Sequence, residues 1–450
     1  MKNVNITILA FVILVFAEPL KSQELHRLTI ASAVDLAKKH NTSVRNAVYD
    51  MDIARQQVIE TTAQGLPQIS AKISYNNNID LPVTLVPAIM FNPNAAAGEF
   101  IELKFGTKHN ASFNFQVSQL IFNGSYIVGL QTAKTFKQLS ERNFQRSENE
   151  VVLTVTQTYN TILFAQKNRL ILKNNLEDIT KTLYESSKIF EAGLMEETNV
   201  DQFKLNKSMV ENAIKSLDRQ IDIQYDLLKI QAGIDIKDSI IITDSLDLVF
   251  NNSNASNAML QSFDISKNID YQLMRTQEEI SKQQVNLEKS TLLPSLNGFY
   301  SHTQSGQSDE FNYFNKSQKW FPSNIIGASL VIPITTSGGA ISRIKQAELS
   351  LRKTQNNISL LEQNLTLGVN GARNKLINDY ETYLTQKENV ALAEKIYKRN
   401  LEKFKQGLIS STELTQVNTQ FYNSQATLYS AMLNVLNAKA EMDKILGNNL

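Results

Sequence analysis

The residues that could perform chemistry are few and are scattered along the chain. The sequence has no cysteine and four histidines, which are His26, His40, His109 and His302. It contains no HExxH or GxSxG motif and neither of the glycine-rich phosphate motifs GxxxxGK[ST] and GxGxxG. Ser337-Gly338-Gly339 could begin a phosphate-binding loop, but the lysine and hydroxyl residue that would follow are missing. We therefore expect no enzymatic activity, no cofactor and no metal site.

The overall composition excludes several other classes of protein. Lys and Arg number 45 and Asp and Glu number 44, so the net charge is +1, whereas a nucleic-acid-binding protein normally carries a basic stripe. The hydrophobic content of 42% argues against a disordered chain. The 16 glycines and 8 prolines are few for 450 residues, which favours long regular elements. A mean hydropathy of −0.24 argues against a bundle of membrane helices, but a membrane barrel of alternating strands is compatible with it.

The N-terminal segment is typical of an export signal. Lys2 supplies a positive charge, and Ile6–Phe16 is a nearly unbroken apolar run of the length that signal peptides have. Such a run is too short to span a membrane, which takes about 20 residues. The pattern predicts a signal peptide over 1–22, cleaved near Ser22, followed by a chain without a transmembrane helix. A buried or interfacial helix is the alternative.

The rest of the chain consists of two similar halves. Leu66-Pro67 recurs in the second half as Leu293-Pro294. Gly193-Leu194 recurs as Gly407-Leu408, and the phenylalanine three positions before each glycine recurs as well. The two copies of the Gly-Leu motif lie closer together than the two copies of Leu-Pro, so the first half contains a longer loop between the motifs. A duplication in register indicates one supersecondary unit used twice.

Each half has the order helix, strand, loop, strand, very long helix, Gly-Leu turn and second helix. Alternating apolar and polar residues, as in Ile69–Asn76, predict the strands. The stretch from Gly124 to Gly193 has no proline, and a helix of about 65 residues would span about 100 Å. We predict a first repeat over 23–233 with strands at about 67–77 and 109–122, a segment over 234–257 that is rich in Asp, Asn and Ser, and a second repeat over 258–450 with strands at about 294–303 and 323–335.

Apolar residues at seven-residue spacing predict that the helices pack as coiled coils. The clearest row, after the second Gly-Leu turn, consists of Leu414, Phe421, Leu428, Val435 and Met442. The fold class predicted from these patterns is mainly α with a small β part and a two-fold internal repeat.

The order of elements, the duplication, the Leu-Pro strand entries and the paired Gly-Leu turns together resemble the TolC family of outer-membrane factors. The opening Leu28-Thr29-Ile30-x-x-Ala33-Val34-x-x-Ala37 is similar to the first helix of that family. The resemblance covers essentially all of the chain after the signal. It implies a homotrimer in which each chain contributes four strands to a shared 12-stranded outer-membrane barrel and helices to a periplasmic α-barrel. It also implies that 234–257 joins an equatorial collar.

The strands themselves agree with this architecture. Four strands cannot close a barrel within one chain, and open edges in lipid leave backbone groups unpaired, whereas trimerisation removes those edges. The loops at 77–109 and 302–322 become extracellular. The aromatic residues of the second loop either form a lipid-interface belt or pack on one another as a loop cluster. These residues are Phe311, Tyr313, Phe314, Trp320 and Phe321.

The resemblance assigns a role to the two turns. Glycine allows the left-handed backbone that a helical reversal needs, and that alone explains Gly193 and Gly407. In the family these turns are the periplasmic tips that dock onto an adaptor protein. We therefore expect Gly193, Leu194, Gly407 and Leu408 to be adaptor contacts.

A pore constriction is also implied by the resemblance. Some family members place acidic residues six and nine positions after the second tip glycine, where this chain has Glu413 and Gln416. The comparable position in the first repeat is Asn199. Three copies of Glu413 around one axis would favour cations. Alternatively, Glu413 is a solvated acid in the first turn of a helix, where the helix dipole favours it.

The expected function is a passive outer-membrane exit channel of a tripartite efflux or type I secretion system, extending into the periplasm. Its partners would be a periplasmic adaptor, an inner-membrane pump (proton-driven or ABC), outer-membrane lipid and two further copies of the chain. No nucleic acid is expected. An exported coiled-coil scaffold or adhesin is the alternative, and a pump's adaptor would show one hairpin rather than two. The cargo cannot be inferred, because the pump selects it.

Overall fold

The computed structural model describes residues 25–448. The predicted signal peptide therefore lies outside the described residues. The chain divides into two compact units, each assembled from separate stretches of sequence. Within the described range, the first unit holds residues 25–51, 140–275 and 357–448, and the second holds 52–139 and 276–356.

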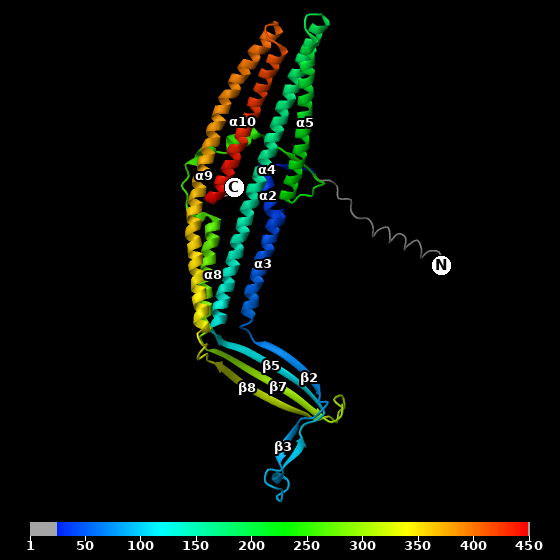
Figure 1. Ribbon diagram of the computed structural model, residues 1–450, viewed down its shortest axis with the longest axis vertical. Helices are drawn as coiled ribbons and strands as arrows, with labels where there is room; N and C mark the ends of the chain where they lie inside the picture. The colour runs from blue at the N-terminus through cyan, green and yellow to red at the C-terminus, as the bar shows by residue number, and fades with distance from the viewer. Residues whose placement is uncertain (1–24, 449–450) are drawn as a thin grey trace, which may run out of the picture. The chain divides into compact units, whose positions relative to one another are not determined.

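The second unit is organised around a four-stranded antiparallel sheet (Figure 1). Its strands, in spatial order, are β2 (Gln68–Asn77), β5 (His109–Asn123), β7 (Ser295–Ser308) and β8 (Trp320–Val331). The two halves of the sequence thus contribute one strand pair each, joined where β5 pairs with β7. Among the described residues, strands β2 and β8 each pair on one side only, so the sheet has two free edges.

The strand bounds differ from the sequence prediction mainly at the second pair. β7 continues to Ser308 and β8 begins at Trp320, because the pairing extends to Gly306 opposite Trp320. Pro322 lies inside β8, which is tolerated because β8 is an edge strand and the missing N–H need not face a neighbour. β8 ends at Val331, before the predicted end at 335.

The long loop of the first half contains a separate hairpin. β3 (Val83–Pro87) pairs with β4 (Phe100–Lys104), and a short 3₁₀ turn, Ala88–Met90, follows β3. The sequence patterns predict only loop for this whole stretch. Several large apolar side chains of the stretch are exposed, namely Ile79, Leu85, Ile89, Met90, Phe91, Phe100 and Phe105.

The aromatic residues of the second loop pack on one another and on the end of β2. The ring centroids of Tyr313 and Trp320 are 5.8 Å apart, and those of Phe311 and Tyr75 are 5.4 Å apart. Phe314 also contacts the Phe311 ring yet remains 91% exposed. The loop cluster is therefore formed, with part of its apolar surface left uncovered.

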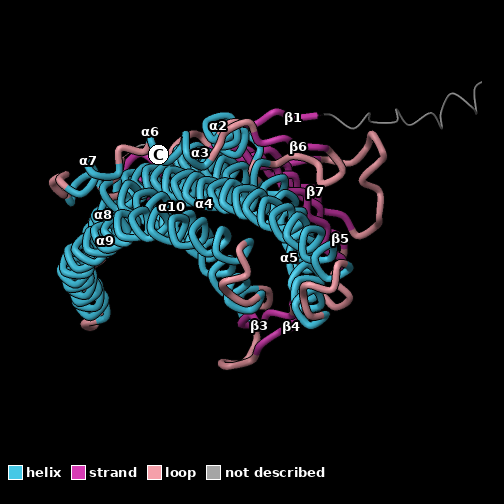
Figure 2. The backbone as a smooth tube through the Cα atoms, turned by 90° about the horizontal axis from the view of Figure 1, so that it is seen from above, coloured by secondary structure: helices cyan, strands magenta, loops and turns pink. Residues whose placement is uncertain are grey.

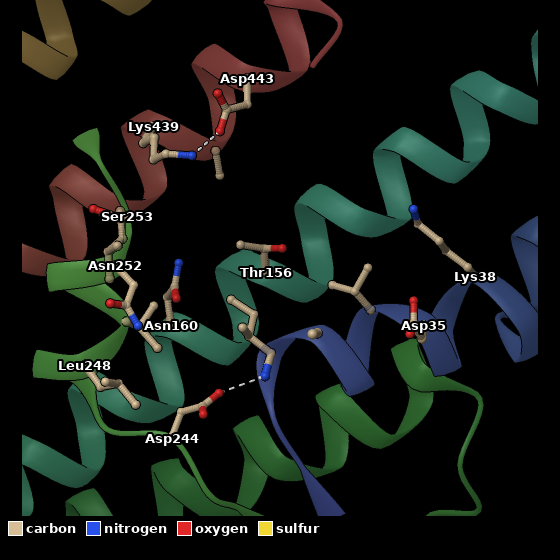
Figure 3. Close-up of a pocket in the computed structure, with 16 residues that line it drawn as sticks. Asp35, Lys38, Thr156, Asn160, Asp244, Leu248, Asn252, Ser253, Lys439 and Asp443 are labelled. Atoms are coloured by element: carbon tan, nitrogen blue, oxygen red, sulfur yellow. Dashed lines mark hydrogen bonds and ion pairs between the residues drawn. The ribbon is translucent and has the colours of Figure 1, made fainter. Parts of the chain in front are cut away.

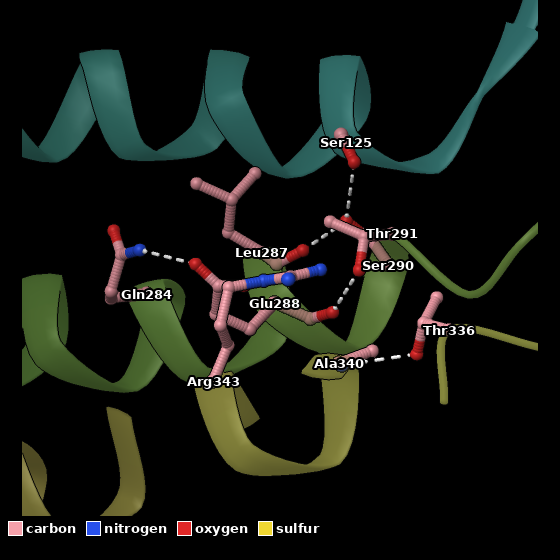
Figure 4. A network of polar contacts seen from close by, with 9 residues as sticks. All are labelled: Ser125, Gln284, Leu287, Glu288, Ser290, Thr291, Thr336, Ala340 and Arg343. Carbon is pink, nitrogen blue, oxygen red and sulfur yellow. Dashed lines mark hydrogen bonds and ion pairs between the residues drawn. The ribbon is translucent and has the colours of Figure 1, made fainter. Parts of the chain in front are cut away.

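Polar contacts join the helix ends that lie next to the sheet (Figure 4). Ser125, at the start of α4 (Gly124–Glu191), hydrogen-bonds Ser290 at the end of α8 (Ile269–Ser290), with 3.1 Å between the hydroxyl oxygens. The Arg343 Nε of α9 (Gly339–Lys405) lies 3.1 Å from the Glu288 Oε2 of α8. A Cβ at Gly124 would lie 2.7 Å from the Cδ1 of Leu293, so a larger residue there would force the leucine side chain to shift.

The helices of the two halves correspond closely in length. α3 (Thr42–Ala63) and α8 (Ile269–Ser290) each have 22 residues, and α5 (Glu197–Ala232) and α10 (Ser411–Leu446) each have 36. α4 (Gly124–Glu191) has 68 residues and α9 (Gly339–Lys405) has 67. The predicted fold class, mainly α with a small β part, is confirmed. None of the described helices is both long and apolar enough to cross a membrane.

The core of the first unit lies between its helices and the mid-chain segment. Tyr159, Leu376 and Val435 are fully buried there, and of the predicted heptad row all but Leu428 are buried. A two-stranded parallel sheet pairs β1 (Leu25–Leu28) with β6 (Ser239–Ile242) beside α2 (Ile30–His40) (Figure 2). The remaining short elements are α6 (Leu246–Asn252), α7 (Ala255–Met259) and a 3₁₀ turn at Ile265–Lys267.

Candidate functional site

The two Gly-Leu turns adopt the same backbone geometry. Gly193 and Gly407 have φ of 74° and 71°, the left-handed region in which glycine is favoured. In the first turn the Gly193 and Leu194 amides donate to carbonyls three and five positions earlier, at 2.8 and 3.0 Å. The second turn repeats both bonds at 2.9 Å. This is the Schellman arrangement, which ends a helix by satisfying its last carbonyl groups.

The leucines of these turns are largely exposed within the described part of the chain. Leu194 is 80% exposed and Leu408 is 66% exposed. A Cβ built on either turn glycine would meet no atom within 4 Å, so the space around both turns is open. Apolar side chains held on rigid turns in open space are suited to contact a partner, and this remains a prediction for all four residues.

The two hairpins, α4–α5 and α9–α10, pack against each other. The rings of Phe203 in α5 and Phe404 in α9 meet edge to face, with centroids 5.6 Å apart. At the start of α10, the Ser411 hydroxyl donates to the Asn199 Oδ1 of α5 at 2.6 Å. Asn199 is therefore half-buried, and its side-chain oxygen holds the second hairpin.

The other two predicted constriction residues are placed differently from Asn199. Glu413 lies in the first turn of α10, and its backbone amide donates to the Ser410 hydroxyl, which caps the helix at 3.1 Å. The side chains of Glu413 and Gln416 are both exposed. Within one chain Glu413 is thus a solvated first-turn acid, and whether it also faces a shared axis depends on the assembly.

A polar link that no sequence pattern predicts joins the two hairpins. The Tyr422 hydroxyl of α10 donates to the Asp178 Oδ2 of α4 at 2.6 Å, and the Tyr397 hydroxyl of α9 donates to the same oxygen at 3.3 Å. Both tyrosines are buried, and the Tyr397 ring stacks on Phe421 with centroids 5.4 Å apart. One carboxylate therefore holds three helices together.

The environment of the link keeps both tyrosines protonated. Burial, reinforced by the Asp178 charge, raises the pKa of Tyr397 to about 12. Burial and the hydrogen bond to Asp178 raise the pKa of Tyr422 even further above its usual range. Both hydroxyls consequently remain hydrogen-bond donors. The bonds to Asp178 therefore hold the helices together and do not transfer protons. The adjacent Phe421 and Tyr422 in the heptad row were the only hint in the sequence.

A cavity of about 480 Å³ lies between α2, α4, α6 and α10 in the first unit (Figure 3). Lys439 and Asp443 form an ion pair at its wall, and Asp244 accepts a hydrogen bond from the Ile30 amide at 2.9 Å. Asn160 is 1% exposed, and its side-chain oxygen has no hydrogen-bond partner among the described residues. Because Lys439, Asp443 and Asp244 are already engaged, we assign this cavity no chemistry. Among the described residues, no group of three or more His, Asp or Glu side chains is placed to hold a metal ion.

Comparison with known proteins places these features in context. The family of outer membrane efflux proteins matches residues 265–448. The outer membrane protein TolC of Vibrio cholerae is 19% identical over 427 residues, which cover 93% of this chain and 90% of that protein.

Several solved structures have the same fold as this chain. CusC, studied for transmembrane channel formation, superposes with a TM-score of 0.73 at 15% identity, over 93% of this chain and 92% of the other. The MtrE outer membrane channel of Neisseria gonorrhoeae, in its open state, gives 0.70 at 15% identity, over 93% and 89%.

Proposed function

The chain belongs to the TolC-like family of outer membrane efflux proteins, and from this membership we propose that it is the outer-membrane exit channel of a tripartite efflux or type I secretion system. In this role it is a passive duct that extends into the periplasm. An inner-membrane pump supplies the energy and selects the cargo, and a periplasmic adaptor connects the two.

The observation that carries the proposal is the four-stranded sheet with two free edges. Strands β2 and β5 alternate apolar and polar side chains, and within residues 25–448 the edges β2 and β8 leave backbone groups unpaired. Lipid offers these groups no hydrogen bonds, so a sheet in a membrane must close on itself. Pairing β8 of one chain with β2 of the next closes a 12-stranded barrel from three chains.

The hairpins supply the connection to the adaptor in this proposal. Leu194 and Leu408 present apolar side chains at the two turns, and each turn is fixed by its hydrogen bonds. An adaptor with a matching apolar surface would bury both leucines. Leu194→Asp combined with Leu408→Asp should therefore abolish cross-linking to the adaptor and drug resistance. Leu205→Asp, at a 57% exposed position within α5, is the matched control. Retention of both properties in the double variant would remove the docking assignment.

The constriction of the duct is proposed to lie near the start of α10. Three copies of Glu413 facing one axis would attract cations, and Asn199 and Gln416 would complete the polar lining. Glu413→Gln should then reduce the cation preference of the channel in planar bilayers. An unchanged conductance and selectivity would leave Glu413 as a solvated first-turn acid.

Fractionation tests the function as a whole. A heat-resistant trimer in the outer membrane supports the channel. A soluble periplasmic monomer would instead indicate an exported coiled-coil scaffold and would rule the channel out. The neighbouring genes then separate the two transport classes, because a proton-driven pump indicates small molecules and an ABC exporter indicates peptides or proteins.

A further inference from the structure

The four strands of the sheet carry a single formal charge. Among the residues of β2, β5, β7 and β8, there is no Asp, Glu or Arg, and Lys72 is the one lysine. It lies near the middle of β2. A lone lysine in the centre of an otherwise neutral sheet needs a physical reason.

The register places Lys72 on the polar face of the sheet. It shares this face of β2 with Ser70 and Ser74, and its partner on β5 is Asn114. Polar contacts run across this face. The Ser74 and Ser112 hydroxyls are 2.7 Å apart, and the Asn114 amide donates to the hydroxyls of two β7 residues at 2.9 and 2.8 Å.

The opposite face of β2 is apolar, and large apolar side chains on that face of the sheet are exposed. Ile69 and Ile73 on β2 are 67% and 80% exposed, and Ile326 on β8 is 86% exposed. In a membrane barrel the apolar face meets lipid and the polar face lines the lumen. A lysine side chain that faces lipid at the membrane centre would destabilise the barrel by about 2–4 kcal/mol. The strand register and this energy both favour a Lys72 side chain that faces the lumen.

Nothing in the described part of the chain neutralises this charge. The Lys72 side chain is exposed, and within residues 25–448 it takes part in no ion pair or hydrogen bond. The polar side chains around it are neutral amides and hydroxyls. Its full positive charge therefore acts on the water beside this face.

We propose that Lys72 lines the lumen of the outer barrel and that its three copies form a cationic ring that favours the passage of anions. The proposal rests on the trimeric channel proposed above. It assigns a selectivity element to the membrane-embedded section, separate from any acidic ring of the hairpins. The favoured permeants are small inorganic anions and organic carboxylates, phosphates or sulfates.

The size of the effect follows from Coulomb's law. For three charges on the order of 10 Å from the axis, in water and screened by 0.1 M salt, anions become about twofold enriched and cations about twofold depleted at the ring. The anion-to-cation permeability ratio should therefore change by about fivefold when the charge is removed. Because the Debye length grows as salt is diluted, the effect should increase at lower ionic strength.

The test measures reversal potentials of the purified full-length channel in planar bilayers under a KCl gradient. Lys72→Gln should shift the reversal potential towards that of a cation-preferring pore, Lys72→Glu should shift it further, and Lys72→Arg should keep the original value. Lys316→Gln removes the same charge from an exposed loop residue and is the control. Every variant keeps the same hairpin constriction, so differences between them report the barrel alone.

A second measurement uses the absence of cysteine in the chain. In Lys72→Cys the new thiol is the only one, so a charged, water-soluble thiosulfonate reagent will modify it only if the position faces water. A cationic reagent should restore the original reversal potential, and an anionic reagent should move it beyond that of Lys72→Gln. Channels that form but show no shift in Lys72→Gln and no modification of the cysteine variant overturn the ring. Failure of the unaltered protein to form any channel overturns the proposed function instead.

Discussion

The Asp178–Tyr422 bond should hold the hairpins in their packed state, and Tyr422→Phe removes it with the smallest change in shape. The hydroxyl and carboxylate oxygens are 2.6 Å apart, and the ring stays buried among the same neighbours. Only the hydroxyl is lost. The Tyr397 hydroxyl still reaches the same carboxylate oxygen, although at the longer distance of 3.3 Å.

The expected cost follows from the type of bond. A hydrogen bond to a charged group contributes about 1.5–3 kcal/mol, and the remaining tyrosine should limit the loss to roughly 1.5–2 kcal/mol per chain. If the bond breaks when the hairpins separate, the separated state gains about 10- to 30-fold in relative population per chain. In a trimer whose hairpins move together, these factors multiply to roughly 10³–10⁴.

Single-channel recording in planar bilayers is the direct assay. Tyr422→Phe should increase the open probability or the mean conductance, and adding Tyr397→Phe should increase it again. Tyr184→Phe is the control, because this tyrosine lies on the same helix, α4, six positions after Asp178, and is 66% exposed. In cells, the same variants should admit large hydrophilic antibiotics that the intact outer membrane excludes.

If the double variant with both tyrosines replaced folds as a trimer and conducts like the unaltered channel, then α4 and α10 do not separate at this position. The link would then contribute to stability alone, and a lower midpoint of thermal unfolding would be its only signature.

Three further outcomes are expected. The pKa values of Tyr397 and Tyr422 are raised in the folded state, so the stabilising hydroxyl donors persist below the unfolded value of about 10 and are lost only as pH rises through the folded values. Conductance should therefore stay constant between about pH 7 and 9. A channel that opens at about pH 9 would contradict this prediction. Gly233→Ala should destabilise the protein by about 2 kcal/mol or more in urea unfolding. The φ of Gly233 is 70°, and the new Cβ would lie 2.5 Å from the carbonyl oxygen of His40 at the end of α2. Gly129→Ala is the control and should be neutral or stabilising, because the space around Gly129 is open. Tyr159→Phe should lower the free energy of unfolding by about 1.5–3 kcal/mol in the same measurement. The buried Tyr159 hydroxyl lies 2.8 Å from the Asp244 Oδ2 and 3.0 Å from the Leu28 carbonyl oxygen, and it donates to both. An unchanged urea midpoint would show that these bonds do not stabilise the protein.

The fold class could be predicted from the sequence because its signals are local and occur twice. Gly193 and Gly407 mark the reversals by their need for a left-handed backbone. The period-two alternation in β2 marks a strand with one polar face, and the absence of proline permits the long helices. Each of these signals lies within a short stretch of chain, and the duplication confirms them in register.

The features that were missed depend on contacts between distant residues. Asp178 and Tyr422 are 244 positions apart, and no local pattern connects a carboxylate on one helix with a hydroxyl on another. The β3–β4 hairpin was also missed, because its strands are only 5 residues long, Pro82 directly precedes the first strand and Pro87 ends it. The cavity beside Asn160 requires separate stretches of chain to be brought together.

The pairing of β1 with β6 has a consequence for the order in which the protein can form. Leu25 lies opposite Ser239, so the first described strand has no partner until about half of the chain has arrived. If the chain is exported from its N-terminus, the apolar side of α2, which includes Ala33, Val34 and Ala37, remains exposed during that interval. An exposed apolar surface of this kind is prone to aggregation. Truncation before Ser239 would leave this segment permanently unmatched. The N-terminal segment therefore cannot complete its fold until β6 has been exported. A periplasmic chaperone that holds unfolded chains would have its greatest effect before the mid-chain segment emerges.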